Sequence, residues 1–264
     1  MKKITDIVQP IAAELARFEA FFAKTLHADT EPMEGIMHYV GDTRGKRLRP
    51  VLVLLSAKLF GEVNEQTLRA ATFVEMVHSA TLLHDDVVDD ADERRGRSSV
   101  KAQFGNLSAV LAGDYLLAKA MLLLSHPDDH DIMLEMLSTA AAMSEGEVMQ
   151  NHVADCVSQP ENPTHYLDII TRKTAMLMRS CCVTGALSVN ATPKQVQQIA
   201  EFGLSFGILF QLRDDILDKE HTEQAKSLIP VYYEKSLQAL ENLHTSEALE
   251  ALRDLTAFCA KRDF

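Results

Sequence analysis

The chain has 264 residues, of which 47% are hydrophobic and 24% are charged, a balance typical of a globular protein with a sizeable core. Its net charge of −12 argues against nucleic acid and anionic membrane surfaces as partners, because both repel an acidic protein. An anionic substrate would therefore need metal ions to offset the charge of the protein.

Nearly every segment spaces its apolar residues as a helix does, and no run of alternating β-branched residues predicts a strand. In the first half we expect helices over residues 4–26, 31–40 and 48–60, the third with Pro50 in its first turn. A helix over about residues 65–90 is apolar in its middle, as expected of a central helix that is buried on most sides. Residues 91–105 are mainly polar and contain glycine, which predicts a loop.

In the second half the same spacing predicts helices over residues 106–126, 130–157 and 164–189, the last two separated by Pro160 and Pro163. Thr192 and Pro193 form a helix start, with a capping residue followed by proline at the first helical position, and that helix runs to about residue 218. Two shorter helices, 230–243 and 245–261, complete the chain. Without a linker or a shift in composition, residues 1–264 are predicted to form a single all-α domain, an antiparallel helical bundle.

The cysteines and the N-terminus bear on the cellular compartment. None of the cysteines forms a C-x-x-C pair, which favours buried thiols in a reducing compartment: Cys156, Cys181, Cys182 and Cys259. The N-terminus is polar from the start, and no stretch reaches eighteen consecutive apolar residues. We therefore expect a cytoplasmic protein without a stable membrane anchor.

Two aspartate runs, each behind an apolar helical segment, are the strongest functional signal. The first contains Asp85, Asp86 and Asp89, and the second, over residues 214–218, repeats the same Asp-Asp-x-x-Asp spacing. On a helix, Asp85 and Asp89 lie on one face, about 6 Å apart along the axis, and their charges repel. Few carboxylates with room left for water and phosphate oxygens are a combination that suits Mg²⁺.

Two basic clusters accompany the aspartates. Lys46, Arg47 and Arg49 stand at the start of a predicted helix, where the helix dipole already attracts phosphate. Arg94 and Arg95 follow the first aspartate run. Each cluster is open to two interpretations: the first is a solvated basic cap or a phosphate site, and the second neutralises the carboxylates or grips phosphate oxygens.

Six motifs in a fixed order extend this pattern over about residues 40 to 230: GKRLRP, HSATLLHDDVVDDADERRG, GDYLLAKA, EGEVMQ, RKTAMLMRSC and FGILFQLRDDILD. Together they resemble the trans-isoprenyl diphosphate synthases, which include farnesyl, geranylgeranyl and long-chain polyprenyl diphosphate synthases. The resemblance implies a helical bundle of the isoprenoid synthase type around a deep central cavity, and usually a homodimer. It also implies about three Mg²⁺ ions per active site, which bridge the aspartates to a diphosphate.

In that family an allylic diphosphate ionises and isopentenyl diphosphate attacks the resulting cation before a proton is lost. The resemblance implies catalytic roles for Asp85, Asp89, Lys173 and Asp214. The implied metal ligands are Asp85, Asp86, Asp89, Asp214, Asp215 and Asp218. The implied contacts to isopentenyl diphosphate are Lys46, Arg49, His78 and Arg95. The implied contacts to the allylic diphosphate are Arg94, Lys173, Thr174 and Gln211, with Lys226 in place of a lysine that follows the second run.

The residues below the first aspartate run bear on product length, and Ala80 stands where short-chain members carry an aromatic residue. This indicates the long-chain branch, with an octaprenyl-like product made from farnesyl or geranyl diphosphate. The predicted chain-length residues are Phe73, Val77, Ala80 and Thr81. Other side chains could instead close the pocket: Met143, Met149 and Leu122.

Three other functions compete with this interpretation. A short-chain farnesyl or geranylgeranyl diphosphate synthase would share the same motifs. A terpene cyclase is disfavoured because the chain has no Trp and only 6% aromatic residues. A non-catalytic partner subunit would have no reason to keep both aspartate runs and both basic clusters.

The sequence departs from the family pattern in two places. The segment after Asp218 is far shorter than the glycine-lysine loop usual in the family, and the charge of Arg213 within the second aspartate motif has no explanation.

Overall fold

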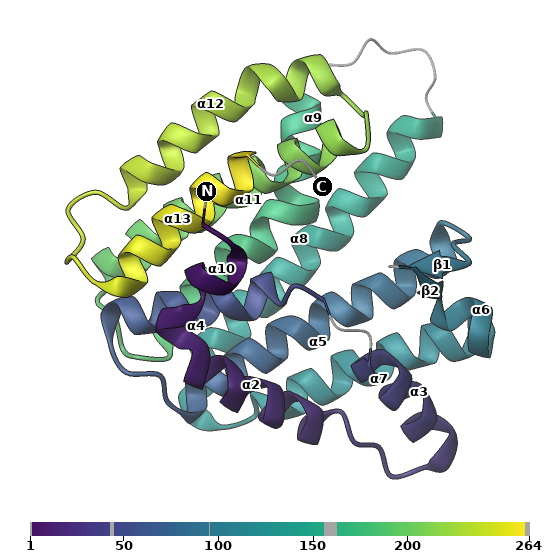
Figure 1. Ribbon diagram of the computed structural model, residues 1–264. Helices are drawn as coiled ribbons and strands as arrows, with labels where there is room; N and C mark the ends of the chain where they lie inside the picture. Colours follow the sequence, from purple (N-terminus) through teal and green to yellow (C-terminus); the bar gives the residue numbers. More distant parts are fainter. Residues whose placement is uncertain (1, 43–44, 95, 156–162, 262–264) are drawn as a thin grey trace.

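The structure is a computed structural model that describes residues 2–42, 45–94, 96–155 and 163–261 (Figure 1). The described residues are almost entirely helical, which confirms the predicted all-α class. The main hydrophobic core joins side chains from helices all along the chain, with the central helices α5 and α10 supplying many of them. In Figure 1, α5 and α7 lie side by side in the lower half of the molecule.

The N-terminal helices are α2 (Ala12–Thr25), α3 (Glu31–Asp42) and α4 (Leu48–Phe60). The prediction of one helix over residues 4–26 is wrong, because α1 (Ile4–Ile7) and a 3₁₀ turn (Gln9–Ile11) precede α2. Pro10 lies in the 3₁₀ turn and has no backbone N–H to donate to a continuous helix.

Helix α5 (Glu65–Val88) begins at a strong cap, where the Asn64 side chain accepts a hydrogen bond from the backbone N–H of Thr67 at 3.0 Å. The loop predicted after it is partly wrong. Residues 91–105 contain an antiparallel hairpin of β1 (Glu93–Arg94) and β2 (Arg97–Ser98), then α6 (Val100–Phe104). Gly96, with φ of 73°, adopts the left-handed conformation at the tip of this hairpin.

The middle of the chain forms α7 (Asn106–Leu123), a 3₁₀ turn (Pro127–Asp129), α8 (His130–Asp155) and α9 (Pro163–Ile170). A π-helical turn (Thr171–Ala175) then joins α9 to α10 (Met176–Leu187) without a break. The single helix predicted over residues 164–189 is therefore continuous in direction but contains one wider turn.

Helix α11 (Pro193–Leu217) starts at the predicted Thr192 cap. Helix α12 (Thr222–Ala239) begins eight residues before its predicted start, because Pro230 lies inside it, and α13 (Glu247–Lys261) follows. Two glycines bring the central helices unusually close. A Cβ at Gly185 of α10 would lie 2.3 Å from the Val53 carbonyl oxygen of α4, and one at Gly207 of α11 would lie 2.6 Å from the Ala175 Cα. The second contact fixes α11 against the π-helical turn.

Candidate active site

The first aspartate run forms the C-terminal end of α5. Asp85 is half-buried, and Asp89 is the exposed C-cap, whose backbone N–H donates to the Asp85 carbonyl at 2.8 Å. His78 lies two turns before Asp85 and therefore on the same side of the helix. This side of α5 presents two carboxylates and an imidazole together.

Asp86 points in a different direction and is only 2% exposed. Its Oδ1 accepts a hydrogen bond from Nε of Arg94, the second residue of β1. Arg94 and Asp86 line a pocket of about 60 Å³ together with His78 and Arg97. The hairpin after α5 thus folds back over the helix end and brings two guanidinium groups to the predicted diphosphate-binding residue His78.

Asp85 lies in a charged environment that includes two other elements. Burial, together with the carboxylates of Glu147 on α8 and Asp89, raises the pKa of Asp85 to about 6, while Lys173 and Arg94 oppose the rise. The Lys173 ammonium lies 2.7 Å from Glu147 Oε2 and donates to Gln150 Oε1 at 3.1 Å. The end of α5, the middle of α8 and the π-helical turn therefore meet at one place.

The raised pKa of Asp85 predicts a pH-dependent stability of the metal-free protein. A carboxyl with a higher pKa in the folded state takes up a proton on folding, so stability falls as pH rises between about 4 and 6. Asp85→Asn removes the charge and is expected to stabilise the metal-free protein at pH 7 by about 1–2 kcal/mol after allowance for solvent screening. Chemical denaturation of both proteins in EDTA at pH 7 and pH 4 measures this difference in the free energy of unfolding. A destabilised variant at pH 7, or an equal gain at both pH values, would contradict the assignment.

The second aspartate run forms the C-terminal end of α11. Asp214 is half-buried, and Asp218 is the exposed C-cap. Asp215 is only 6% exposed, and both of its oxygens accept hydrogen bonds, Oδ1 from Gln211 Nε2 at 2.8 Å and Oδ2 from the Tyr166 hydroxyl. Each run thus has outer aspartates on the more open side of the helix and a middle aspartate turned into the protein.

A chain of contacts joins the two runs. The Thr174 hydroxyl donates to Gln211 Oε1 at 2.7 Å, and Gln211 in turn holds Asp215. Lys173, the residue before Thr174, contacts α8 and acts electrostatically on Asp85. The π-helical turn is therefore the meeting point of both carboxylate clusters.

The basic residues of the GKRLRP motif divide between the surface and the interior. Lys46 is exposed and Arg49 is half-buried. Arg47 is the N-cap of α4 with φ of 50°, and its guanidinium lies 2.7 Å from Glu75 Oε1 and 2.9 Å from Glu19 Oε1. Arg47 therefore anchors the start of α4 to α2 and α5, which fixes the position of its neighbours.

The other two predicted substrate contacts are Lys226 and Arg95. Lys226 on α12 is exposed and lies 3.0 Å from Glu223 Oε1. Arg95 lies outside the described residues, as does Cys156.

The polyprenyl synthetase family model matches residues 30–227, three quarters of the chain. The chain belongs to the polyprenyl synthetase family. It is 35% identical over 222 residues to the octaprenyl diphosphate synthase of Haemophilus influenzae, covering 83% of this chain and 67% of the relative. The chain thus spans about two thirds of the length of such relatives. Two other relatives, from Geobacillus stearothermophilus and Bacillus subtilis, are named as component 2 of a heptaprenyl diphosphate synthase.

Solved structures of polyprenyl synthetases share the fold. A decaprenyl diphosphate synthase from Rhodobacter capsulatus aligns with a TM-score of 0.90 and 25% identity over 99% of this chain and 100% of that one. A polyprenyl synthase from Caulobacter crescentus, in complex with calcium and isoprenyl diphosphate, aligns with a TM-score of 0.88 and 23% identity over 99% and 98% of the two chains. The arrangement of the helices is therefore that of the isoprenoid synthase fold.

The donor set of this polyprenyl synthetase fits a hard divalent cation. Aspartate oxygens at the ends of α5 and α11 are the ligands that Mg²⁺ prefers. Among the described residues, no group of three or more His, Cys, Asp or Glu side chains converges closely enough to enclose an ion. A metal here would need additional oxygen ligands from water and from a bound diphosphate, as Mg²⁺ usually takes.

The predicted chain-length residues of this polyprenyl synthetase lie on two sides of α5. The His84 ring lies directly against Gly113 of α7, so the side of α5 that carries His84 faces α7. Phe73, Val77 and Ala80 share that side and are almost completely buried. Thr81 is partly exposed and lies one turn before Asp85, with its hydroxyl donating to the His78 carbonyl at 2.9 Å. Thr81 is thus the member of the set closest to the carboxylate side.

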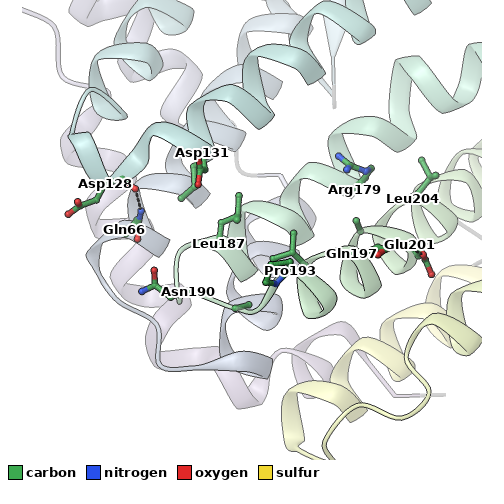
Figure 2. A pocket seen from close by; sticks show the side chains of 14 residues that line it. Gln66, Asp128, Asp131, Arg179, Leu187, Asn190, Pro193, Gln197, Glu201 and Leu204 are labelled. Carbon is green, nitrogen blue, oxygen red and sulfur yellow. Dashed lines mark hydrogen bonds between the residues drawn. The ribbon is translucent and has the colours of Figure 1, made fainter.

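A wide groove of about 1050 Å³ lies at the other end of the same helices (Figure 2). Gln66 and Asp128 meet at its edge, where the Gln66 amide donates to the Asp128 carbonyl at 2.6 Å, and Arg179 is ion-paired with Glu135. Its polar groups do not converge on one point, so we assign no chemistry to it.

Sequence reasoning missed three residues of the site in this polyprenyl synthetase. Arg47 was not distinguished from its basic neighbours, although it makes the buried ion pairs. Glu147 lies in the EGEVMQ motif and received no role, although it contacts Lys173. Tyr166 could not be identified from the sequence, because its partner Asp215 lies 49 residues further along the chain.

Proposed function

We propose that this chain is an all-trans prenyltransferase that condenses farnesyl or geranyl diphosphate with isopentenyl diphosphate to a medium- or long-chain polyprenyl diphosphate. The observation that carries the proposal is the chain of contacts through the π-helical turn, which joins two carboxylate runs at the ends of α5 and α11. Family membership and the long-chain relatives support the same reaction.

The outer aspartates are the proposed ligands for Mg²⁺: Asp85, Asp89, Asp214 and Asp218. This narrows the predicted set of six, because Asp86 is hydrogen-bonded to Arg94 and both oxygens of Asp215 accept bonds from protein groups. When bound, about three Mg²⁺ ions would neutralise the diphosphate and act as Lewis acids on its departure. Asp86 and Asp215 then act as anchors for the groups around them.

The chain's own cations would orient the two diphosphates. Lys173 supplies a fixed positive charge beside Asp85, and exchange of its Glu147 contact for a phosphate oxygen would place that charge on the leaving group. Arg94, which the resemblance assigns to the allylic diphosphate, lines a pocket with Arg97 and His78, so we place it instead at the second diphosphate. Lys46, Arg49 and Arg95 complete the proposed grip on isopentenyl diphosphate. Partial burial lowers the local dielectric and strengthens each of these contacts.

The experiment is incubation of the purified chain with Mg²⁺, farnesyl diphosphate and radiolabelled isopentenyl diphosphate, with the products sized after dephosphorylation. Labelled polyprenols longer than C20 are the expected result. Products that stop at C15 or C20 would favour the short-chain alternative, and cyclic hydrocarbons a terpene cyclase. Absence of turnover, with activity restored only by a second protein, would identify a subunit of a two-component synthase.

The surface suggests a homodimer. Outward-facing apolar side chains form one stripe on α7 and another on α8, and no described element covers them: Leu107, Val110, Leu111, Met121, Leu122, Leu134, Leu137 and Val148. Helix α7 is also the one described helix that is long and apolar enough to cross a membrane, which is weak evidence by itself. We propose that a second copy of the chain covers these stripes, because exposed apolar surface of this extent marks an interface.

The dimer proposal gives a prediction for two leucines on α7. Leu107 and Leu122 are 74% and 71% exposed, so Leu107→Glu/Leu122→Glu should leave the fold intact and convert the dimer into monomers. Sedimentation equilibrium at micromolar concentration measures the mass. Val231→Glu on α12, at a residue that is 45% exposed, is the control and should remain dimeric. A monomeric wild type, or a double variant of unchanged mass, would contradict the proposal.

We also propose that the chain forms a single domain and that it is located in the cytoplasm. A single domain over residues 1–264 is supported by one hydrophobic core that draws on helices from both halves of the chain. A cytoplasmic location is supported by the buried cysteine side chains of Cys181, Cys182 and Cys259, which suit a reducing compartment.

A further inference from the structure

The second aspartate run is held by a side chain from outside its own helix. The hydroxyl of Tyr166 on α9 donates to Oδ2 of Asp215, while Gln211, one turn earlier on α11, donates to Oδ1 at 2.8 Å. Asp215 is almost fully buried between these two partners, with Asp214 and Asp218 beside it on the same helix end. Both donors are neutral, so these two hydrogen bonds bring no counter-ion to the carboxylate.

Tyr166 is itself rigidly placed. It is 8% exposed and belongs to a small hydrophobic cluster with Ile208, Leu212 and Ala225. Burial raises the pKa of Tyr166 above its usual range, and the Asp215 carboxylate raises it further, so the hydroxyl stays protonated and remains a donor. A phenol in a packed cluster holds one orientation, and the hydrogen bond transmits that orientation to Asp215.

The same ring also contacts the turn that follows α11. Only three residues, 219–221, separate Asp218 from the start of α12, and Lys219 and His221 have φ of 63° and 40°. The Tyr166 and His221 ring centroids lie 4.7 Å apart. The backbone N–H of Glu220 donates to the Asp215 carbonyl at 2.7 Å, which closes the turn onto the run. Tyr166 therefore contacts both the aspartate run and the turn that follows it.

The network extends to the proposed diphosphate-binding cation. Gln211 accepts a hydrogen bond from Thr174, and the preceding residue, Lys173, lies against α8 rather than α11. Consecutive side chains on a helix point in different directions, so Lys173 and Thr174 reach different helices from the same π-helical turn. The position of Asp215 is thus coupled to the turn that presents Lys173.

From this geometry we propose that Tyr166 is a positioning residue. Its hydroxyl, together with Gln211, fixes Asp215 as an anchor, so that Asp214 and Asp218 are held in place to receive a metal–diphosphate complex. The inference rests on the proposed function of the site, and it makes Asp215 a support for the metal ligands rather than a ligand. Because the connection to α12 is short, this contact holds the aspartate run without a long covering loop.

The test measures metal binding directly. Mn²⁺ accepts the same oxygen ligands as Mg²⁺, and the electron paramagnetic resonance signal of the free ion reports binding in the presence of inorganic diphosphate. Tyr166→Phe keeps the ring and removes only the hydroxyl, and it is expected to weaken Mn²⁺ binding by about 10-fold or more, the usual effect of removing a support to a metal ligand. Tyr232→Phe, which packs against the same cluster, is the matched control and should bind as the wild type does.

Two aspartate variants separate an anchor from a ligand. Asp215→Asn keeps a carbonyl oxygen for Tyr166 and is expected to bind Mn²⁺ at least about 10-fold more tightly than Asp214→Asn. Equal binding by these two variants, or equal binding by Tyr166→Phe and Tyr232→Phe, would overturn the inference. Gln211→Met provides a second route to the same loss if Tyr166→Phe does not fold by circular dichroism. A wild type that binds Mn²⁺ with diphosphate but does not extend farnesyl diphosphate would refute the proposed reaction and leave the positioning test intact.

Discussion

Asp85→Asn is expected to lower kcat at saturating Mg²⁺ by about 100-fold or more. The substitution keeps the size of the side chain and removes one of the two outer carboxylates at the end of α5, so a metal–diphosphate complex loses a charged ligand. Steady-state kinetics with farnesyl and isopentenyl diphosphate measure the change, and circular dichroism verifies the fold. Because charged Asp85 destabilises the metal-free protein, this variant should be more stable and less active at pH 7.

Asp90→Asn is the matched control. Asp90 belongs to the same run, but its side chain is exposed and its Oδ1 accepts from Lys101 at 2.6 Å. Asparagine also tolerates its left-handed φ of 53°. The control should keep kcat within about two-fold, since an exposed ion pair contributes little. Near-normal turnover in Asp85→Asn, or an equal loss in both variants, would refute the assigned role of Asp85.

Thr81→Phe is expected to shorten the main product by several isoprene units. Thr81 is partly exposed one turn below Asp85, so a phenyl ring there would block the growing chain if, as the proposed function requires, it extends down α5 from the carboxylates. Ala80→Phe should also shorten the product, with an added loss of about 1–3 kcal/mol in stability, because Ala80 is completely buried on the side of α5 that faces α7. Sizing of the dephosphorylated products by thin-layer chromatography measures both effects.

Thr81→Val controls for the lost hydroxyl, because valine keeps the volume and removes only the hydrogen bond to the His78 carbonyl. Its product should match that of the wild type. An unchanged product in Thr81→Phe would move the floor of the channel to another helix, with Met143 on α8 the first residue to examine.

Most of the fold could be predicted because helix boundaries carry local chemistry. The Thr192–Pro193 start of α11 and the apolar spacing of α5 are properties of neighbouring residues, and the structure confirms both. Two of the errors, at the ends of α2 and α12, arose because a proline can either interrupt a helix or lie inside one. Pro10 interrupts a helix, whereas Pro230 is accommodated inside α12, and only the surrounding packing decides between the two.

The residues of the site could be predicted from the sequence, but the direction in which each side chain points could not. Asp85 and Asp86 are adjacent, yet their side chains differ by about 100° around the helix axis, so only one can face a given partner. Which one does so depends on where the hairpin places Arg94. Lys46 and Arg47 are likewise neighbours, and the buried carboxylate of Glu75 on another helix selects Arg47 for the interior.

The wide turn between α9 and α10 has a consequence for the length of the chain at this point. A π-helical turn holds one more residue than an α-helical turn in the same rise, so deletion of a single residue between 171 and 175 would restore a regular helix and leave α9 and α10 in their present relative orientation. Tyr166, its cluster and the buried side of α10 would keep their contacts, whereas the side chains inside the turn would be redistributed. A one-codon deletion here should therefore give a folded protein in which Lys173 and Thr174 no longer both reach their partners Glu147 and Gln211.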